Sequence, residues 1–133
     1  MRVVLDASAA VCLVMRLPEA VELAARLEPA THVLAPGLFH AEVANALWKY
    51  VRADQLRCDA ALERLGEAAD LVDDFIPDAE MAAEALAAAH QYGHPVYDLL
   101  YAITARRHGC ALLTLDERLA KLLSRMEISR LTS

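Results

Sequence analysis

The sequence has little cysteine, glycine, aromatic residue or positive charge, and each shortage excludes a class of protein. The three cysteines, Cys12, Cys58 and Cys110, form no C-x-x-C pair for a zinc or redox site, so we interpret them as small hydrophobic groups. Four glycines supply no G-x-G-x-x-G loop for dinucleotide binding. A formal charge of −6 argues against a protein that binds nucleic acid mainly through electrostatic attraction to phosphates, because such binding needs clustered lysine and arginine.

Long hydrophobic runs are also missing. Although 57% of the residues are hydrophobic and the mean hydropathy is +0.27, no apolar stretch approaches the roughly 18–20 residues that span a bilayer. The chain enters a strand-like segment directly after Arg2, so we expect no secretory signal, no membrane attachment and a cytoplasmic protein. The length of 133 residues predicts a single domain over residues 1–133, and the 5% of aromatic residues predicts an aliphatic core.

Strand-like and helix-like segments alternate along the chain. Apolar runs predict strands over residues 2–5, 32–35, 72–76 and 110–114, with an edge strand around Ile128. Helical periodicity predicts helices over residues 9–15, 18–27, 38–52, 59–71, 79–92, 95–108 and 116–123. Ser8 is the expected N-cap of the first helix, and Pro18 is expected to open the second. This alternation predicts an α/β fold with a parallel sheet covered by helices.

Four carboxylates stand out by their position: Asp6, Glu42, Asp98 and Asp116. Asp6 and Asp116 follow apolar strand-like runs, Asp98 opens an apolar helical stretch, and Glu42 lies on the helix over residues 38–52. Residues just past the carboxyl ends of strands in an open α/β sheet converge on one crevice. Acids gathered there repel one another at neutral pH unless a cation holds them. The leading hypothesis is therefore a divalent metal site.

Each of these acids also has an ordinary structural interpretation. Asp6 and Asp116 can cap the helices that follow them, although Ser8 offers the first of these caps. Asp98 gains about 0.3–1 kcal/mol from the helix dipole in any first turn. Glu42 can be an exposed surface residue. The joint pattern favours the metal site over four separate explanations.

Other polar residues are candidates for supporting roles. The hydroxyls of Ser8 and Thr114 can orient a carboxylate or a water held by the metal. Asn45 and Lys49 share a helix face with Glu42, so Lys49 can contact a substrate phosphate. Arg52 is a further candidate for substrate binding, and Arg118 is a candidate for the rim of the site. We interpret His90, His94 and His108, near predicted helix ends, as caps or surface groups.

Two other enzyme classes match parts of the sequence poorly. His40-Ala41-Glu42 fits the first half of the zinc nucleobase-deaminase signature, but the downstream P-C-x-x-C that completes its zinc shell is missing. A phosphatase of the haloacid type needs a second aspartate two residues after Asp6, where Ser8 stands.

Four short stretches together resemble the PIN-domain nucleases, in particular the VapC-type toxins of toxin–antitoxin pairs. These stretches are Val4-Leu5-Asp6-Ala7-Ser8-Ala9, Ala41-Glu42-Val43-Ala44-Asn45-Ala46-Leu47, Val96-Tyr97-Asp98-Leu99-Leu100-Tyr101 and Leu113-Thr114-Leu115-Asp116. Their order and approximate spacing agree with the family from Arg2 to about Leu123. Each stretch is short, but all four in a chain of this length form a fairly specific pattern.

The resemblance implies a three-layer α/β/α sandwich with a central parallel sheet and a Mg²⁺- or Mn²⁺-dependent endoribonuclease. Asp6, Glu42, Asp98 and Asp116 would form its catalytic and metal-binding cluster, with Ser8 and Thr114 as hydroxyl supports. The resemblance also implies an RNA substrate cleaved by metal-activated water, a homodimer, and a cognate antitoxin that holds the toxin inactive. The alternative is a catalytically inactive PIN-like module that serves only for binding or as a scaffold.

Overall fold

The computed structural model describes residues 1–132, in which four parallel strands form one sheet. The strands are β1 (Arg2–Leu5), β2 (His32–Pro36), β3 (Asp74–Ile76) and β4 (Ala111–Leu113), in the spatial order β3-β2-β1-β4. Val3 pairs with Val33 on one side and with Ala111 on the other. Val3, Val4 and Leu5 are all buried, because helices cover both faces of a parallel sheet of this kind.

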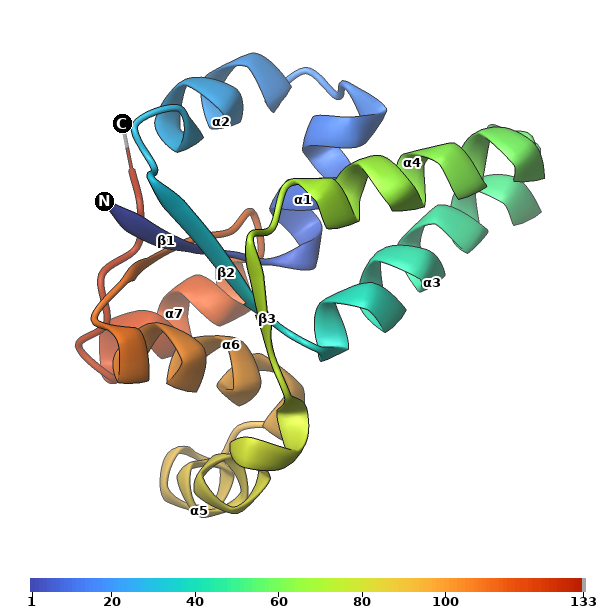
Figure 1. The fold of residues 1–133 in the computed structure, drawn as a ribbon. Coiled ribbons are helices and arrows are strands. Elements are labelled where there is room, and N and C mark those ends of the chain that lie inside the picture. The colour runs from blue at the N-terminus through green and yellow to red at the C-terminus, as the bar shows by residue number, and fades with distance from the viewer. Residues whose placement is uncertain (133) are drawn as a thin grey trace.

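Helices pack on both faces of the sheet (Figure 1). One layer holds α1 (Ala7–Met15), α2 (Ala20–Leu27), α3 (Leu38–Arg52) and α4 (Cys58–Asp70); the other holds α5 (Ala82–Tyr92), α6 (Val96–His108) and α7 (Glu117–Arg125). Strand side chains alternate between the layers: Val3 and Leu5 pack in the first, Val4 in the second. The predicted three-layer α/β/α sandwich is confirmed.

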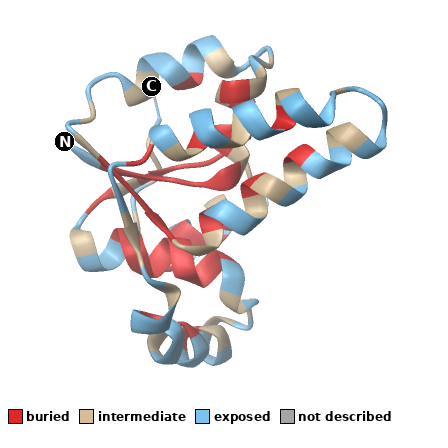
Figure 2. Ribbon diagram, turned by 45° about the vertical axis from the view of Figure 1, so that its right-hand side comes forward, coloured by how far each residue is buried: buried red, intermediate tan, exposed pale blue. Residues whose placement is uncertain are grey.

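Helix α6 is the most deeply buried helix and contacts β1, β2 and β4. Every residue from Asp98 to Ala105 is buried, and Figure 2 shows this helix in red beneath the sheet. Gly109, in a left-handed conformation with φ of 60°, ends it. The first turn of α6 thereby fixes Asp98 next to the carboxyl ends of the strands.

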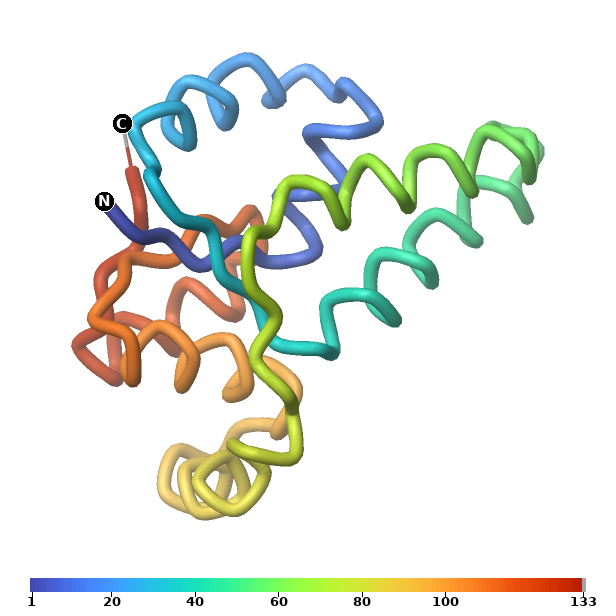
Figure 3. Tube along the Cα trace, viewed as in Figure 1, coloured from blue at the N-terminus to red at the C-terminus, as the bar shows by residue number. Residues whose placement is uncertain are grey.

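Helices α3 and α4 form a hairpin that extends beyond the edge of the sheet (Figures 1 and 3). Asp54, with φ of 57°, adopts the left-handed conformation in the turn between them. At its start, α3 is tied to the chain after β3, because Leu38 N donates to the Asp78 carboxylate at 3.1 Å. Within residues 1–132, no helix is both long enough and apolar enough to cross a bilayer.

Several predicted boundaries differ from the structure. Ser8 does not cap α1: the cap is Asp6, whose Oδ1 accepts from Ala9 N at 2.9 Å, because the chain leaves β1 directly into the helix. Pro18 lies in the turn before α2, which begins at Ala20. The third strand is shorter than predicted, since the Asp73 carboxylate instead accepts from Val33 N at 2.7 Å.

The predicted edge strand at Ile128 is also wrong. A single parallel bridge joins Leu112 to Arg130, two residues further along. The helix predicted from residue 79 begins instead as a short 3₁₀ turn, Asp78–Glu80, before α5.

Candidate active site

All four predicted carboxylates line one cavity of about 650 Å³, together with Ser8, Asn45 and Lys49. The cavity lies where Asp6 and Asp116 follow β1 and β4. Strand β1 pairs with β2 on one side and with β4 on the other, so the order of the strands reverses at this point (Figure 3). Such a switch point is where open α/β sheets bind ligands. The folded chain thus brings together acids from four separate segments.

Asp6 is the most constrained of the four acids. It is only 4% exposed, and its carboxylate accepts from Ala9 N, from the Ser8 hydroxyl at 2.8 Å, and from the Thr114 hydroxyl. The pKa of Asp6 is raised to about 6, chiefly by burial and also by the nearby charge of Asp116, although these hydrogen bonds lower it. Asp6 therefore carries a charge that the surrounding protein only partly compensates.

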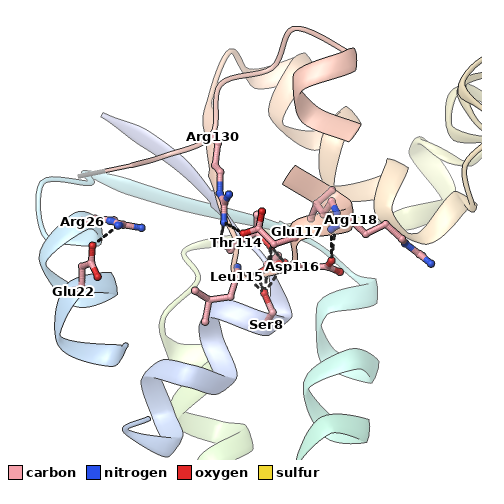
Figure 4. A network of polar contacts seen from close by, with 11 residues as sticks. Ser8, Glu22, Arg26, Thr114, Leu115, Asp116, Glu117, Arg118 and Arg130 are labelled. Carbon is pink, nitrogen blue, oxygen red and sulfur yellow. Dashed lines mark hydrogen bonds and ion pairs between the residues drawn. The ribbon is translucent and has the colours of Figure 1, made fainter. Parts of the chain in front are cut away.

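The Ser8 and Thr114 hydroxyls join the ends of β1 and β4. Ser8 Oγ accepts from Leu115 N at 3.0 Å, and Thr114 Oγ1 accepts from Asp116 N at 2.9 Å (Figure 4). The two hydroxyl oxygens lie 3.3 Å apart. We call this pair the hydroxyl clasp. It fixes the Asp6 carboxylate relative to the backbone that carries Asp116.

Asp98 is held by two side chains that the sequence did not identify as its partners. Its Oδ2 accepts from His94 Nε2 at 2.7 Å and lies 3.3 Å from Arg118 Nε. The interpretation of His94 as a cap or surface group is wrong, since its side chain is only 10% exposed and binds Asp98. No helical spacing could have revealed this pair, because His94 precedes α6, which begins at Val96.

Glu42 is half-buried on α3 and lies near the other acids. Burial raises its pKa, the Tyr101 hydroxyl lowers it, and the charges of Asp98, Asp116 and Asp78 raise it again. Among residues 1–132, the buried Tyr101 hydroxyl has no well-formed hydrogen bond, although it faces Glu42 and Tyr101 lines the cavity. A buried donor of this kind calls for a polar occupant nearby, such as water or a ligand oxygen.

Asp116 is the N-cap of α7, as one of its two interpretations predicted. Its Oδ1 accepts from Arg118 N at 2.9 Å and from Leu119 N at 3.3 Å. Arg130 contacts the same segment, donating to Thr114 O and to the Glu117 carboxylate (Figure 4). The cap uses one carboxylate oxygen, so it does not conflict with a second role in the cavity.

The donor set of the cavity fits a hard divalent cation, which prefers carboxylate oxygens. In the part of the chain that is described, however, no three acid, histidine or cysteine side chains stand close enough together to hold one ion. The carboxylates are turned toward protein donors instead: Asp98 toward His94 and Arg118, Asp6 toward the hydroxyl clasp. Binding an ion would require these carboxylates to turn away from their present donors.

The candidate substrate-binding residues separate into two groups. Asn45 and Lys49 line the cavity beside Glu42. Arg52 is not among the lining residues, and its guanidinium lies 4.6 Å above the Trp48 ring. The cavity is also lined by residues that the sequence analysis did not propose for the site, among them Val11, Cys12, Leu17, Ala46, Tyr50 and Gln55.

Comparison with known proteins agrees with this architecture. The family model of the PIN domain matches residues 3–123. The chain is 34% identical over 123 residues to ribonuclease VapC3 of Pyrobaculum aerophilum. This alignment covers 91% of this chain and 94% of that protein. The crystal structure of PAE2754 from Pyrobaculum aerophilum has a similar fold, with a TM-score of 0.68 at 24% identity over 96% of this chain and 90% of that one. The chain therefore belongs to the PIN-domain family, among its VapC-type members.

Proposed function

We propose that this protein is a Mg²⁺- or Mn²⁺-dependent endoribonuclease, the toxin of a type II toxin–antitoxin pair. The observation that carries the proposal is the gathering of Asp6, Glu42, Asp98 and Asp116 around one cavity at the switch point of the sheet. Membership of the PIN-domain family and similarity to a protein named as a ribonuclease support RNA as the substrate.

Asp6 and Asp98 would hold the cation, joined by Glu42 or Asp116. When bound, the ion would supply a water of lowered pKa and charge stabilisation at the phosphodiester. The hydroxyl clasp keeps Asp6 in place, so this ligand needs little reorganisation. Lys49 can contact a non-bridging phosphate oxygen, and Asn45 can hydrogen-bond to the substrate beside it.

Proton transfer in this cavity falls to a carboxylate that is not engaged by the ion. Glu42 is the best placed, because it is half-buried near the other acids, and burial and their charges raise its pKa. Attack by water rather than by the ribose hydroxyl leaves a 5′-phosphate and a 3′-hydroxyl. End-labelling of the products distinguishes this chemistry from cyclic-phosphate formation.

The decisive experiment is cleavage of a defined RNA panel with Mg²⁺, with Mn²⁺ and with excess chelator. Asp6→Asn preserves an acceptor for the α1 cap but removes the charge, so we expect cleavage to fall at least about 100-fold while the fold persists. Glu63→Gln, an exposed acid-to-amide change on α4, is the matched control. Full activity of Asp6→Asn, or of the wild type in chelator, would refute the proposal.

The alternative is a binding or scaffold module without catalysis. It is favoured by one observation, namely that Asp98 and Asp6 are already engaged by protein donors. Calorimetric titration with Mn²⁺ separates the two. The nuclease should bind Mn²⁺ and lose most of that binding in Asp98→Ala, whereas a scaffold module should bind no ion and cleave no RNA.

The proposed partners are a cognate antitoxin, a second copy of the chain, and RNA, all in the cytoplasm. The Arg118 contact with Asp98 supports an antitoxin arginine entering the acid end of the cavity, since a guanidinium is already accommodated there. A copurified antitoxin without a basic residue at the cavity would count against this. Exposed Trp48, Leu86 and Tyr97 are apolar surface available for a homodimer, which sedimentation equilibrium would detect.

A further inference from the structure

The acids form only part of the cavity lining, and a second part is mainly apolar apart from Lys49 and Gln55. Its walls are Val11 and Cys12 on α1, Leu17 after that helix, and Ala46 and Tyr50 on α3. We call these five residues the apolar arm. A metal ion and a phosphate account for the acids but gain nothing from aliphatic walls, so the arm suits a different occupant.

Helix geometry places the arm beside the acids but at a distance from them. Ala46 and Tyr50 follow Glu42 at four and eight residues, so all three share one face of α3. With a rise of 1.5 Å per residue, Tyr50 lies about 12 Å along the helix from Glu42, and Lys49 lies just before it. A group in the arm is therefore a neighbour of the phosphate at the acids, not that phosphate itself.

The turn after α3 adds an amide side chain to the same wall. Asp54 takes the left-handed conformation, and Gln55 N donates to Tyr50 O at 2.9 Å, so the chain doubles back at the end of the helix. Gln55 consequently lines the cavity with Tyr50. Its amide offers both a hydrogen-bond donor and an acceptor at the margin of the apolar arm.

Apolar walls, one aromatic ring and one amide are the chemistry that recognises a nucleobase. Bases of single-stranded RNA stack on tyrosine and also hydrogen-bond through their edges, whereas ribose and phosphate form hydrogen bonds but do not stack. A neutral base needs no compensating charge in the arm, so Lys49 remains available to a phosphate beside it. The continuity of the arm with the acid end supports an RNA base over an unrelated ligand.

We infer that the apolar arm and Gln55 form a nucleobase subsite, which takes one unstacked base adjacent to the phosphodiester at the acids. This subsite rests on the proposed nuclease function, since its occupant is part of the same substrate. An apolar side chain of the antitoxin is the competing occupant.

The test begins with unaltered protein and a synthetic single-stranded RNA that it cleaves at one bond in Mn²⁺. Matched RNAs carry an abasic ribose at the nucleotide on either side of that bond, or several nucleotides away as a control. We expect the abasic site on one side to raise KM about ten-fold, in the range of base–aromatic stacking, with a smaller change in kcat. The distant abasic site should leave KM unchanged.

Two variants locate the effect in the protein. Ala46→Leu fills the arm, and Gln55→Ala removes the amide from an exposed position that the fold does not need. Both variants should raise KM for the intact RNA. Ala46→Leu should raise KM little further for the RNA whose abasic ribose already removes the base that binds in the arm. Ala41→Leu, exposed on the same helix and outside the cavity, is the control.

The outcomes separate the subsite from the function on which it rests. If the protein cleaves the RNA and its KM is unchanged by an abasic ribose on either side of the bond, the subsite is overturned and the nuclease proposal stays intact. An Ala46→Leu protein that binds the antitoxin more weakly, with its KM for RNA unchanged, assigns the arm to the antitoxin and also overturns the subsite. Failure of the wild type to cleave any RNA in Mg²⁺ or Mn²⁺ overturns both.

Discussion

At the scale of single residues, Asp6 combines two interpretations that the sequence presents as alternatives. It caps α1 through Ala9 N and also lies buried in the candidate active site. The preceding strand made its position predictable, but the assignment of the cap to Ser8 was wrong. Ser8 instead belongs to the hydroxyl clasp, a contact between residues 106 apart that no local pattern encodes.

The raised pKa of Asp6 predicts a specific pH dependence of stability in metal-free protein. The unfolded carboxyl ionises near 3.8 and the folded one near 6, so folding becomes less favourable as pH rises through this window. Above pH 6, the loss of folding stability due to the ionised Asp6 levels off at about 3 kcal/mol. Asp6→Asn should therefore gain stability relative to wild type between pH 4.5 and 7, measured by urea unfolding in chelator. If the difference in unfolding free energy between Asp6→Asn and wild type does not change with pH across this range, as expected for Glu63→Gln, the assignment is contradicted.

Arg118 should compete with a cation for Asp98. Its side chain is 64% exposed and its Nε lies 3.3 Å from Asp98 Oδ2, so the ion pair itself stabilises the fold little. Arg118→Gln should tighten Mn²⁺ binding several-fold in calorimetry because it frees that oxygen. Lys121→Gln, the same loss of charge at an exposed position of α7, should have a smaller effect. Weaker Mn²⁺ binding in Arg118→Gln would instead make Arg118 a residue that positions Asp98.

At the scale of helices and strands, the sequence predicted elements better than their ends. The bounds of α3 follow from its periodicity, and α6 ends at Gly109 as its glycine indicates. The predicted start of the third strand and the predicted strand at Ile128 were wrong, because strand pairing there depends on which distant segment lies alongside in the folded chain. His94 was missed for a related reason: it precedes α6, where helical spacing is not expected to hold.

The cap of α7 allows the structural and chemical roles of Asp116 to be separated. Asparagine retains the acceptor for Arg118 N and Leu119 N, whereas alanine removes it. We expect Asp116→Asn to keep wild-type thermal stability but lose RNA cleavage. Asp116→Ala should lose cleavage and also about 1 kcal/mol of stability, measured by denaturant unfolding. Equal stability of the two variants would show that the cap contributes nothing.

At the scale of the whole molecule, the parallel sheet was predictable but the shape of the cavity was not. Alternating elements indicate the α/β class, and the ends of strands indicate where acids gather. The strand order β3-β2-β1-β4 and the apolar arm depend on how distant helices pack. Tyr50 and Gln55 meet there only because of the hairpin between α3 and α4, and Cys12 faces the same space from α1.

The net charge of −6 predicts RNA binding that depends weakly on salt. Lys49 is the cation that lines the cavity, so few phosphates of the substrate lose counterions on binding. With one or two phosphate contacts, the slope of log affinity against log salt should stay near −1 for single-stranded RNA. Measuring KM from about 50 to 200 mM NaCl tests this expectation. A slope several times steeper would reveal a basic surface that engages the RNA backbone elsewhere.

The hydroxyl clasp has a consequence for how the protein is made. Because Ser8 must reach Thr114 and Leu115, the hollow around Asp6 is completed by a segment that is synthesised 106 residues after Ser8. A nascent chain that has not yet extruded its fourth strand lacks two of the groups that border Asp6. The acid cavity therefore takes its folded form only after this later segment has emerged from the ribosome.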